Sequence, residues 1–176
     1  ITAAKAGSVI GVVSSCIYGV TLITLYTMSS VYHGLRPGMA KKVMQVLDHC
    51  TIYFLIAGSY TPILLVAMRP KYPALAWVLF GIVWGCAIIA CALTAIDLKK
   101  YSVFSMICYL AMGWTIIFFI KQTYEVMSLG GVIFLVAGGV AYTVGSILYG
   151  LGKTKKWMHS IFHIFILAGS ILHFFA

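Results

Sequence analysis

Two histidines near the C-terminal end of the chain have the spacing of a metal-binding pair. They are His159 and His163, in the stretch "KTKKWMHSIFHIFILAGSILHFF", where three lysines lead into an apolar run. Residues four apart share one face of a helix, so both imidazoles can reach a single ion. A third imidazole from a neighbouring helix end would complete three protein ligands and leave a fourth position for water. That is the layout of a catalytic zinc site.

The pair "HSIFH" lacks the glutamate that serves as general base in the H-E-x-x-H metalloproteases. Another carboxylate must therefore hold the water or take its proton. The chain has three acids. We expect Asp48 to lie near the histidines, Asp97 to belong to a loop or a helix end, and Glu125 to lie on the opposite side.

The elements that position these residues must be membrane helices. Hydrophobic residues make up 62% of the 176 positions and charged residues 9%, and the mean hydropathy is +1.06. Such a composition excludes a soluble domain. Continuous apolar runs favour transmembrane helices over the alternating pattern of a membrane β-barrel.

Six apolar runs are long enough to be helices, and the loops between them are short. We predict one all-α transmembrane bundle over residues 1–176, with no soluble domain. Its helices are expected at about 8–33, 45–68, 73–94, 101–120, 128–151 and 157–175.

The net charge of +9 predicts membrane topology, and we expect no nucleic-acid partner. Eight of the basic residues fall in alternate loops, at 34–44, 95–100 and 152–156, and the positive-inside rule assigns these loops to the cytoplasm. The other four fall on the opposite side. In the order of the two sides, the basic residues are Arg36, Lys41, Lys42, Lys99, Lys100, Lys153, Lys155 and Lys156, then Lys5, Arg69, Lys71 and Lys121.

Ionisable side chains cost free energy inside a bilayer, and this topology places most of them at one membrane face. His33 is expected in the last turn of the first helix, Asp48 and His49 in the first turn of the second, and the histidine pair at the start of the last. Ser29 shares a face with His33, so its hydroxyl either supports the metal water or bonds back to its own helix. His49 could also be a ligand, but it lies ~100° around the helix from Asp48 and is expected to face elsewhere.

Several features have a structural reading. Histidines near a membrane interface often form hydrogen bonds between helices, and we expect His173, ~15 Å from His163 along its helix, to be such a packed residue. Pro62 predicts a kink, and the small residues of 138–145 and Gly81-x-x-x-Gly85 predict close helix packing. The cysteines form no C-x-x-C pair and are expected to be buried: Cys16, Cys50, Cys86, Cys91 and Cys108.

The segments "SSVYHGL", "DHCTIYFLIAGSYTPILL" and "HSIFH" resemble the hemolysin III family. This family comprises bacterial relatives of the adiponectin and progestin receptors, within a superfamily of membrane hydrolases that includes alkaline ceramidases. The resemblance covers essentially the whole chain. It implies zinc held by His33, His159 and His163, with Asp48 and Ser29 around the bound water. It also implies seven helices, so we expect the first to be missing from this chain.

Three functions are compatible with these residues. The first is zinc-dependent hydrolysis of a lipid amide bond, resembling ceramidase activity, with Asp48 as general base and a membrane lipid as substrate. The second is a receptor-like sensor of lipid or membrane state, active in membrane homeostasis without turnover. The third is a cytolytic hemolysin, although a secreted pore former needs a soluble state. In each case we expect an integral protein of the bacterial plasma (inner) membrane, with its metal site near the cytoplasmic face.

Overall fold

The computed structural model describes residues 7–151 and 157–176, apart from the side chains of Leu151 and His159. These residues form six helical stretches and no β-strand, so the predicted all-α fold is confirmed. Five of the stretches are long and apolar enough to cross a bilayer, which confirms a polytopic membrane protein. The sixth has a shorter apolar part, Ser160–Phe175. Four of the basic residues used for the topology lie outside the described residues: Lys5, Lys153, Lys155 and Lys156.

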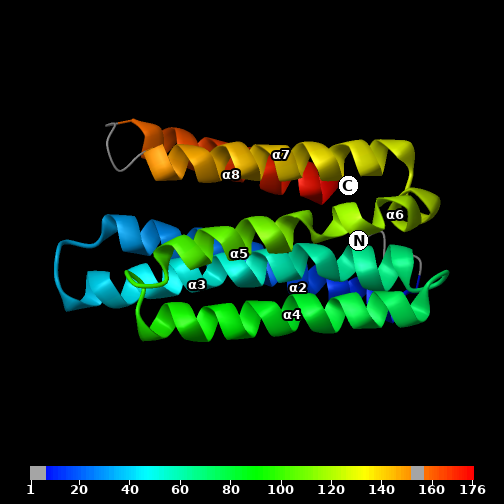
Figure 1. Cartoon of the computed structure of the whole chain (residues 1–176), viewed down its shortest axis with the longest axis horizontal. Helices are drawn as coiled ribbons and strands as arrows, with labels where there is room; N and C mark the ends of the chain where they lie inside the picture. The colour runs from blue at the N-terminus through cyan, green and yellow to red at the C-terminus, as the bar shows by residue number, and fades with distance from the viewer. Residues whose placement is uncertain (1–6, 152–156) are drawn as a thin grey trace. The chain divides into compact units, whose positions relative to one another are not determined.

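The chain divides into two compact units, Ile1–Met112 and Gly113–Ala176, here called unit 1 and unit 2. The single bundle over residues 1–176 stays a prediction. Figure 1 shows the helices of each unit. Unit 1 contains α2 (Val9–Gly34), α3 (Met39–Pro62), the π-helix η1 (Ile63–Met68), α4 (Pro73–Ile96) and most of α5 (Ser102–Trp114). Unit 2 contains the 3₁₀-helix η2 (Thr115–Phe119), α6 (Ile120–Val126), α7 (Leu129–Leu151) and α8 (Met158–Phe175).

Helix α3 begins at Met39, well before the predicted start at Gln45. Hydropathy finds only the part of a helix that lies in lipid, whereas Met, Ala and Lys are good helix formers outside it. The first turn is held to the end of α2 by Lys41, whose Nζ donates to the Leu35 carbonyl at 2.8 Å and lies 5.3 Å from the centre of the Tyr32 ring. The extra turns therefore project α3 beyond the end of α2.

The fourth stretch is interrupted and longer than predicted. The α-helix α5 ends at Trp114, a 3₁₀ segment follows, and α6 continues to Val126 instead of ending near Ile120. Gly113 and the β-branched residues Thr115 and Ile116 lower the helix propensity at this point, and a tighter turn results.

In unit 1, α3 lies between α2 and α4 and packs against both. It comes close to α2 at Gly58, which faces the side chain of Thr21. A Cβ added to Gly58 would lie 3.0 Å from Thr21 Cγ2 and would clash with Thr21 Oγ1. Small residues allow two helix backbones to approach in this way in a membrane protein. This contact sets the register of α2 against α3.

Pro62 changes the type of helix at the end of α3. Proline has no N–H, so the Gly58 carbonyl loses its usual donor four residues on. The chain continues as the π-helix η1, with the Arg69 N–H donating to the Leu64 carbonyl at 2.9 Å. The Thr61 hydroxyl donates to the Ala57 carbonyl at 2.9 Å.

Unit 2 contains an antiparallel pair, α7 and α8 (Figure 1). As predicted for residues 138–145, small residues let the two helices approach closely: Gly138 faces the His173 ring, and a Cβ on Gly169 would lie 2.8 Å from the Tyr142 ring. The same prediction for Gly81 and Gly85 is wrong, because a Cβ at either position meets no described atom within 4 Å. His173 is the packed residue that we expected, with Nε2 3.1 Å from the Leu135 carbonyl oxygen and its ring edge-on to Tyr142.

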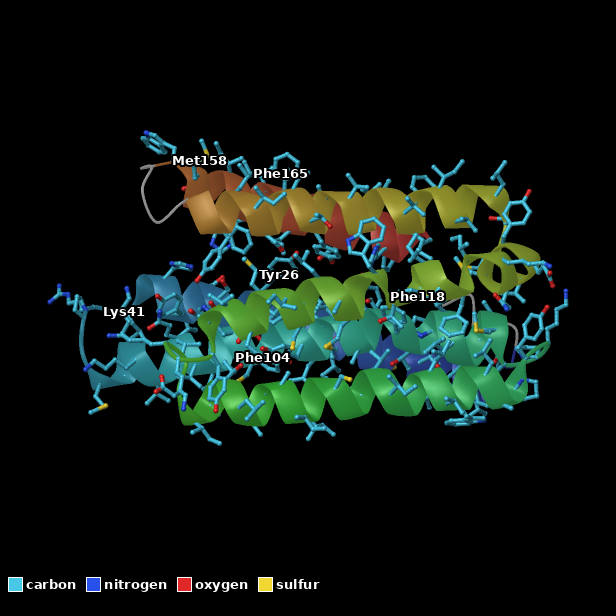
Figure 2. All side chains as sticks on the ribbon, in the orientation of Figure 1. Tyr26, Lys41, Phe104, Phe118, Met158 and Phe165 are labelled. Atoms are coloured by element: carbon cyan, nitrogen blue, oxygen red, sulfur yellow. The ribbon has the colours of Figure 1, made fainter. Side chains whose placement is uncertain are left out.

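Large apolar side chains cover much of the surface of the helices, and Figure 2 labels Phe104 and Phe118 among them. Phe118 is 82% exposed. A soluble monomer rarely exposes this much apolar surface, whereas lipid tails are a suitable environment for it. The prediction that all five cysteines are buried is wrong for Cys16 and Cys86, which are exposed on their helices. Lipid accepts a thiol as readily as a small apolar side chain.

We predict that Gly58→Ala destabilises the protein, because the new methyl group must displace Thr21. Overpacking of this kind costs about 1–3 kcal/mol, and each kcal/mol lowers the unfolding midpoint by roughly 2–4 °C. The measurement is the thermal unfolding midpoint in detergent. Gly81→Ala is the matched control, because a Cβ at Gly81 meets no described atom within 4 Å. An equal loss in both variants would contradict the close approach at Gly58.

Candidate metal centre

The end of α2 presents Ser29 and His33. Helix α2 ends at Gly34, so His33 lies in its last turn, as predicted. Ser29 is one turn earlier on the same face. The imidazole is exposed and the hydroxyl is half-buried. Both residues therefore lie close to the end of unit 1 that carries Arg36, Lys41 and Lys42 (Figures 1 and 2).

Asp48 lies deeper in α3 than expected. Because the helix begins at Met39, Asp48 is in its third turn, and the prediction of the first turn is wrong. The contact of Gly58 with Thr21 nevertheless fixes a register of α2 and α3 in which Asp48 keeps its expected depth relative to His33, despite the longer α3. Along α2, Ser29 lies about 12 Å and His33 about 18 Å from Thr21. Along α3, Asp48 lies about 15 Å from Gly58 in the same direction. Asp48 is thus level with the segment of α2 between Ser29 and His33.

His49 lies beside Asp48. The two side chains are 16% and 13% exposed, and His49 Nδ1 is 3.9 Å from Asp48 Oδ2. His49 Nδ1 also contacts the Gln45 carbonyl oxygen at 2.8 Å, so the ring is drawn back along its own helix, and its orientation away from the metal ligands stays a prediction. A protonated Nδ1 donates in this contact, which fixes the orientation of the ring.

The backbone around Asp48 is held from two sides. The Thr51 hydroxyl donates to the Asp48 carbonyl at 2.7 Å, and the Tyr109 hydroxyl, from α5, donates to the His49 carbonyl at 2.9 Å. The carboxylate is therefore partly shielded from solvent and held on a fixed segment of helix.

The histidine pair lies at the start of α8. This helix begins at Met158, so its first two turns include both His159 and His163, as the spacing predicts. His163 is half-buried, and its ring centre is 4.8 Å from that of Phe162. The side chain of His159 lies outside the described residues.

The other two acids lie on other segments of the chain. Asp97 caps the end of α4, as expected, and its Oδ1 accepts from the N–H groups of Lys99 and Lys100 at 3.1 and 3.0 Å. Glu125 is an exposed residue near the end of α6. Asp48 is the acid on α3, where the register of α2 and α3 brings it level with the segment between Ser29 and His33.

The described side chains contain no group of three His, Cys, Asp or Glu residues that could hold a metal. Ser29, His33 and Asp48 belong to unit 1, whereas His159 and His163 belong to unit 2. The zinc site stays a prediction. Its donor types fit the ion, because imidazole nitrogen is a common zinc ligand and three such ligands leave one position open.

Comparisons with known proteins identify the family. The model of the family described as "Haemolysin-III related" matches residues 1–174. Hemolysin-3 of Bacillus cereus is 38% identical over 99% of this chain and 78% of its own, and the Hemolysin-3 homolog of Bacillus subtilis (strain 168) is 37% identical over 99% and 80%. The human monocyte to macrophage differentiation factor is 26% identical over 93% of this chain and 68% of its own. No solved structure shows a significant match. The chain is therefore a membrane protein of the haemolysin III family.

Proposed function

We propose that this protein is a zinc-dependent hydrolase that cleaves an amide bond of a membrane lipid, as a ceramidase does. Its zinc ligands are His33, His159 and His163, Asp48 is the general base, and Ser29 supports the water with a hydrogen bond. The observation that carries the proposal is the register of α2 and α3, which puts Asp48 level with Ser29 and His33.

The location follows from charge. Five basic residues lie at the end of unit 1 that carries His33, namely Arg36, Lys41, Lys42, Lys99 and Lys100, whereas Arg69 and Lys71 lie at the other end. The positive-inside rule assigns the first end to the cytoplasm. We accordingly propose that the protein resides in the plasma (inner) membrane, with its metal site near the cytoplasmic face.

Each part of the site has a separate task. A zinc ion supplies a Lewis acid and lowers the pKa of water toward about 7. Asp48 accepts a proton from the attacking water and returns it to the leaving amine, and its partial burial keeps bulk water from competing. His49, held by the Gln45 carbonyl, is itself a polar neighbour of the Asp48 carboxylate. The apolar faces of the helices hold the acyl chain in the bilayer.

We predict that the detergent-purified protein binds about one zinc per chain, measured by elemental analysis. His33→Ala and His163→Ala should each lose about 10- to 100-fold or more in zinc affinity, by analogy with damage to other metal sites. His173→Ala is the matched control, because this ring packs against Tyr142 and contacts the Leu135 carbonyl. A folded wild type without metal, or equal loss in all three variants, would remove the zinc mechanism.

We predict that Asp48→Asn keeps zinc but releases fatty acid from a fluorescent N-acylsphingosine about 10²- to 10⁴-fold more slowly, because the amide cannot accept the proton. Asp97→Asn is the control, since Asp97 caps a loop. Zinc binding without any turnover in the wild type, across a panel of lipid amides, would instead support the receptor-like sensor.

Cytolytic activity is the alternative that the names of the bacterial relatives favour. Lysis can follow indirectly when an enzyme alters membrane lipids. Red cells exposed to membranes containing the protein distinguish the two origins, because lysis through lipid hydrolysis is lost in Asp48→Asn. Lysis that is unchanged in this variant would favour a direct effect of the protein on the membrane.

A further inference from the structure

The two loops at one end of unit 1 carry an excess of positive charge. Residues 34–44 and 95–101 contain five basic side chains and one acid, Asp97. Asp97 Oδ1 accepts from the backbone N–H groups of Lys99 and Lys100, so this carboxylate is engaged within its own loop. We call the five basic residues the basic end of unit 1: Arg36, Lys41, Lys42, Lys99 and Lys100.

The start of α3 places apolar side chains among these charges. Met39, Val43 and Leu47 recur at every fourth position, so they lie along one side of the helix. Their side chains are 75%, 53% and 42% exposed. Water is an unfavourable environment for such a stripe of large apolar residues. Its exposure therefore indicates contact with lipid.

The length by which α3 projects indicates which part of a bilayer surrounds this stripe. Measured from the contact of Gly58 with Thr21, the first residue of α3 lies roughly 9 Å beyond the last residue of α2. The headgroup layer on each side of a bilayer is about 5–8 Å thick. With the end of α2 at the edge of the hydrocarbon core, the first two turns of α3 lie among the headgroups. Apolar side chains at that level reach the acyl chains, while lysine and arginine reach the phosphates.

We propose that the basic end of unit 1 is a docking surface for anionic phospholipids, with Arg36 and Lys42 as its main contacts to the phosphate. Both side chains are exposed. Lys41, labelled in Figure 2, is held in place, because its Nζ donates to the Leu35 carbonyl and lies over the Tyr32 ring. A phosphate diester supplies the negative charge that these loops lack.

The occupant is a lipid and not a free anion, because the stripe of Met39, Val43 and Leu47 needs an acyl chain beside the phosphate. A surface of this kind gives the protein a preference among the lipids of its membrane. It does not depend on bound zinc or on hydrolysis.

The opposite end of unit 1 offers a matched control. It carries two basic residues, Arg69 and Lys71. Arg69 Nε donates to the Leu65 carbonyl at 3.2 Å, and Lys71 Nζ lies 5.5 Å from the centre of the Tyr72 ring. The double variants Arg36→Gln/Lys42→Gln and Arg69→Gln/Lys71→Gln therefore remove the same charge from the two ends.

The test uses protein purified in detergent, mixed with equal amounts of phosphatidylglycerol and phosphatidylcholine, and recovered by affinity chromatography. Mass spectrometry then quantifies the bound lipids. We expect the wild type to be enriched in phosphatidylglycerol. The enrichment should fall roughly 5-fold or more in Arg36→Gln/Lys42→Gln, since one basic residue near an anionic surface contributes about a factor of five. The Arg69→Gln/Lys71→Gln variant should keep most of the enrichment, and the thermal unfolding midpoint checks that both variants are folded.

Salt provides a second measurement on the wild type alone. Sodium chloride should lower the enrichment, because it screens exposed charges, and sodium phosphate at the same ionic strength should lower it no further. A larger loss in phosphate would indicate a site for a free anion and would overturn the proposal. So would a wild type without enrichment, or an equal loss in the two double variants.

Discussion

The arrangement of unit 1 depends on one close contact, where the Gly58 backbone meets the side chain of Thr21. In lipid there is no hydrophobic driving force for helix association, so the close fit at small residues decides how two helices pack. Because Gly58 has no side chain, α2 and α3 can pack closely at this point, and they do so in one register. That register brings Ser29, His33 and Asp48 to similar depth, although α3 extends several residues beyond α2 at that end.

Glycines also allow close packing of α7 and α8 in unit 2. There they face aromatic rings, whereas Gly58 in unit 1 faces a threonine. Gly138 leaves space for the His173 ring, and Gly169 leaves space for the Tyr142 ring. The two rings are edge-on at 5.1 Å between centres, and the Tyr142 hydroxyl is 2.8 Å from Ser170 Oγ. Polar groups of the pair thus meet one another away from lipid, which is the condition for keeping them in a membrane helix.

Hydropathy predicts the helices well, because lipid imposes a minimum length and forbids unpaired backbone groups. It predicts their ends poorly outside lipid, as the early start of α3 at Met39 shows. For Asp48, the sequence predicts the correct end of unit 1 but the wrong turn of α3. For His49, helical angles do not give the contact with the Gln45 carbonyl, which draws the ring back along α3. The contact of the Cys50 thiol with the Cys91 carbonyl, 3.6 Å from sulfur to oxygen, requires the register of two helices, which periodicity does not encode.

The π-helix from Ile63 to Met68 also affects the length of the second helical stretch. A π-turn holds one residue more than an α-turn, so the segment behaves as an inserted residue that the helix absorbs without being broken. Leu64 and Met68 are fully buried within it, while Arg69 Nε donates to the Leu65 carbonyl at 3.2 Å near its end. A chain shortened by one residue here would return to α-helical pairing while the residues before Pro62 kept their places. This turn is therefore where related sequences can gain or lose a residue without displacing Asp48.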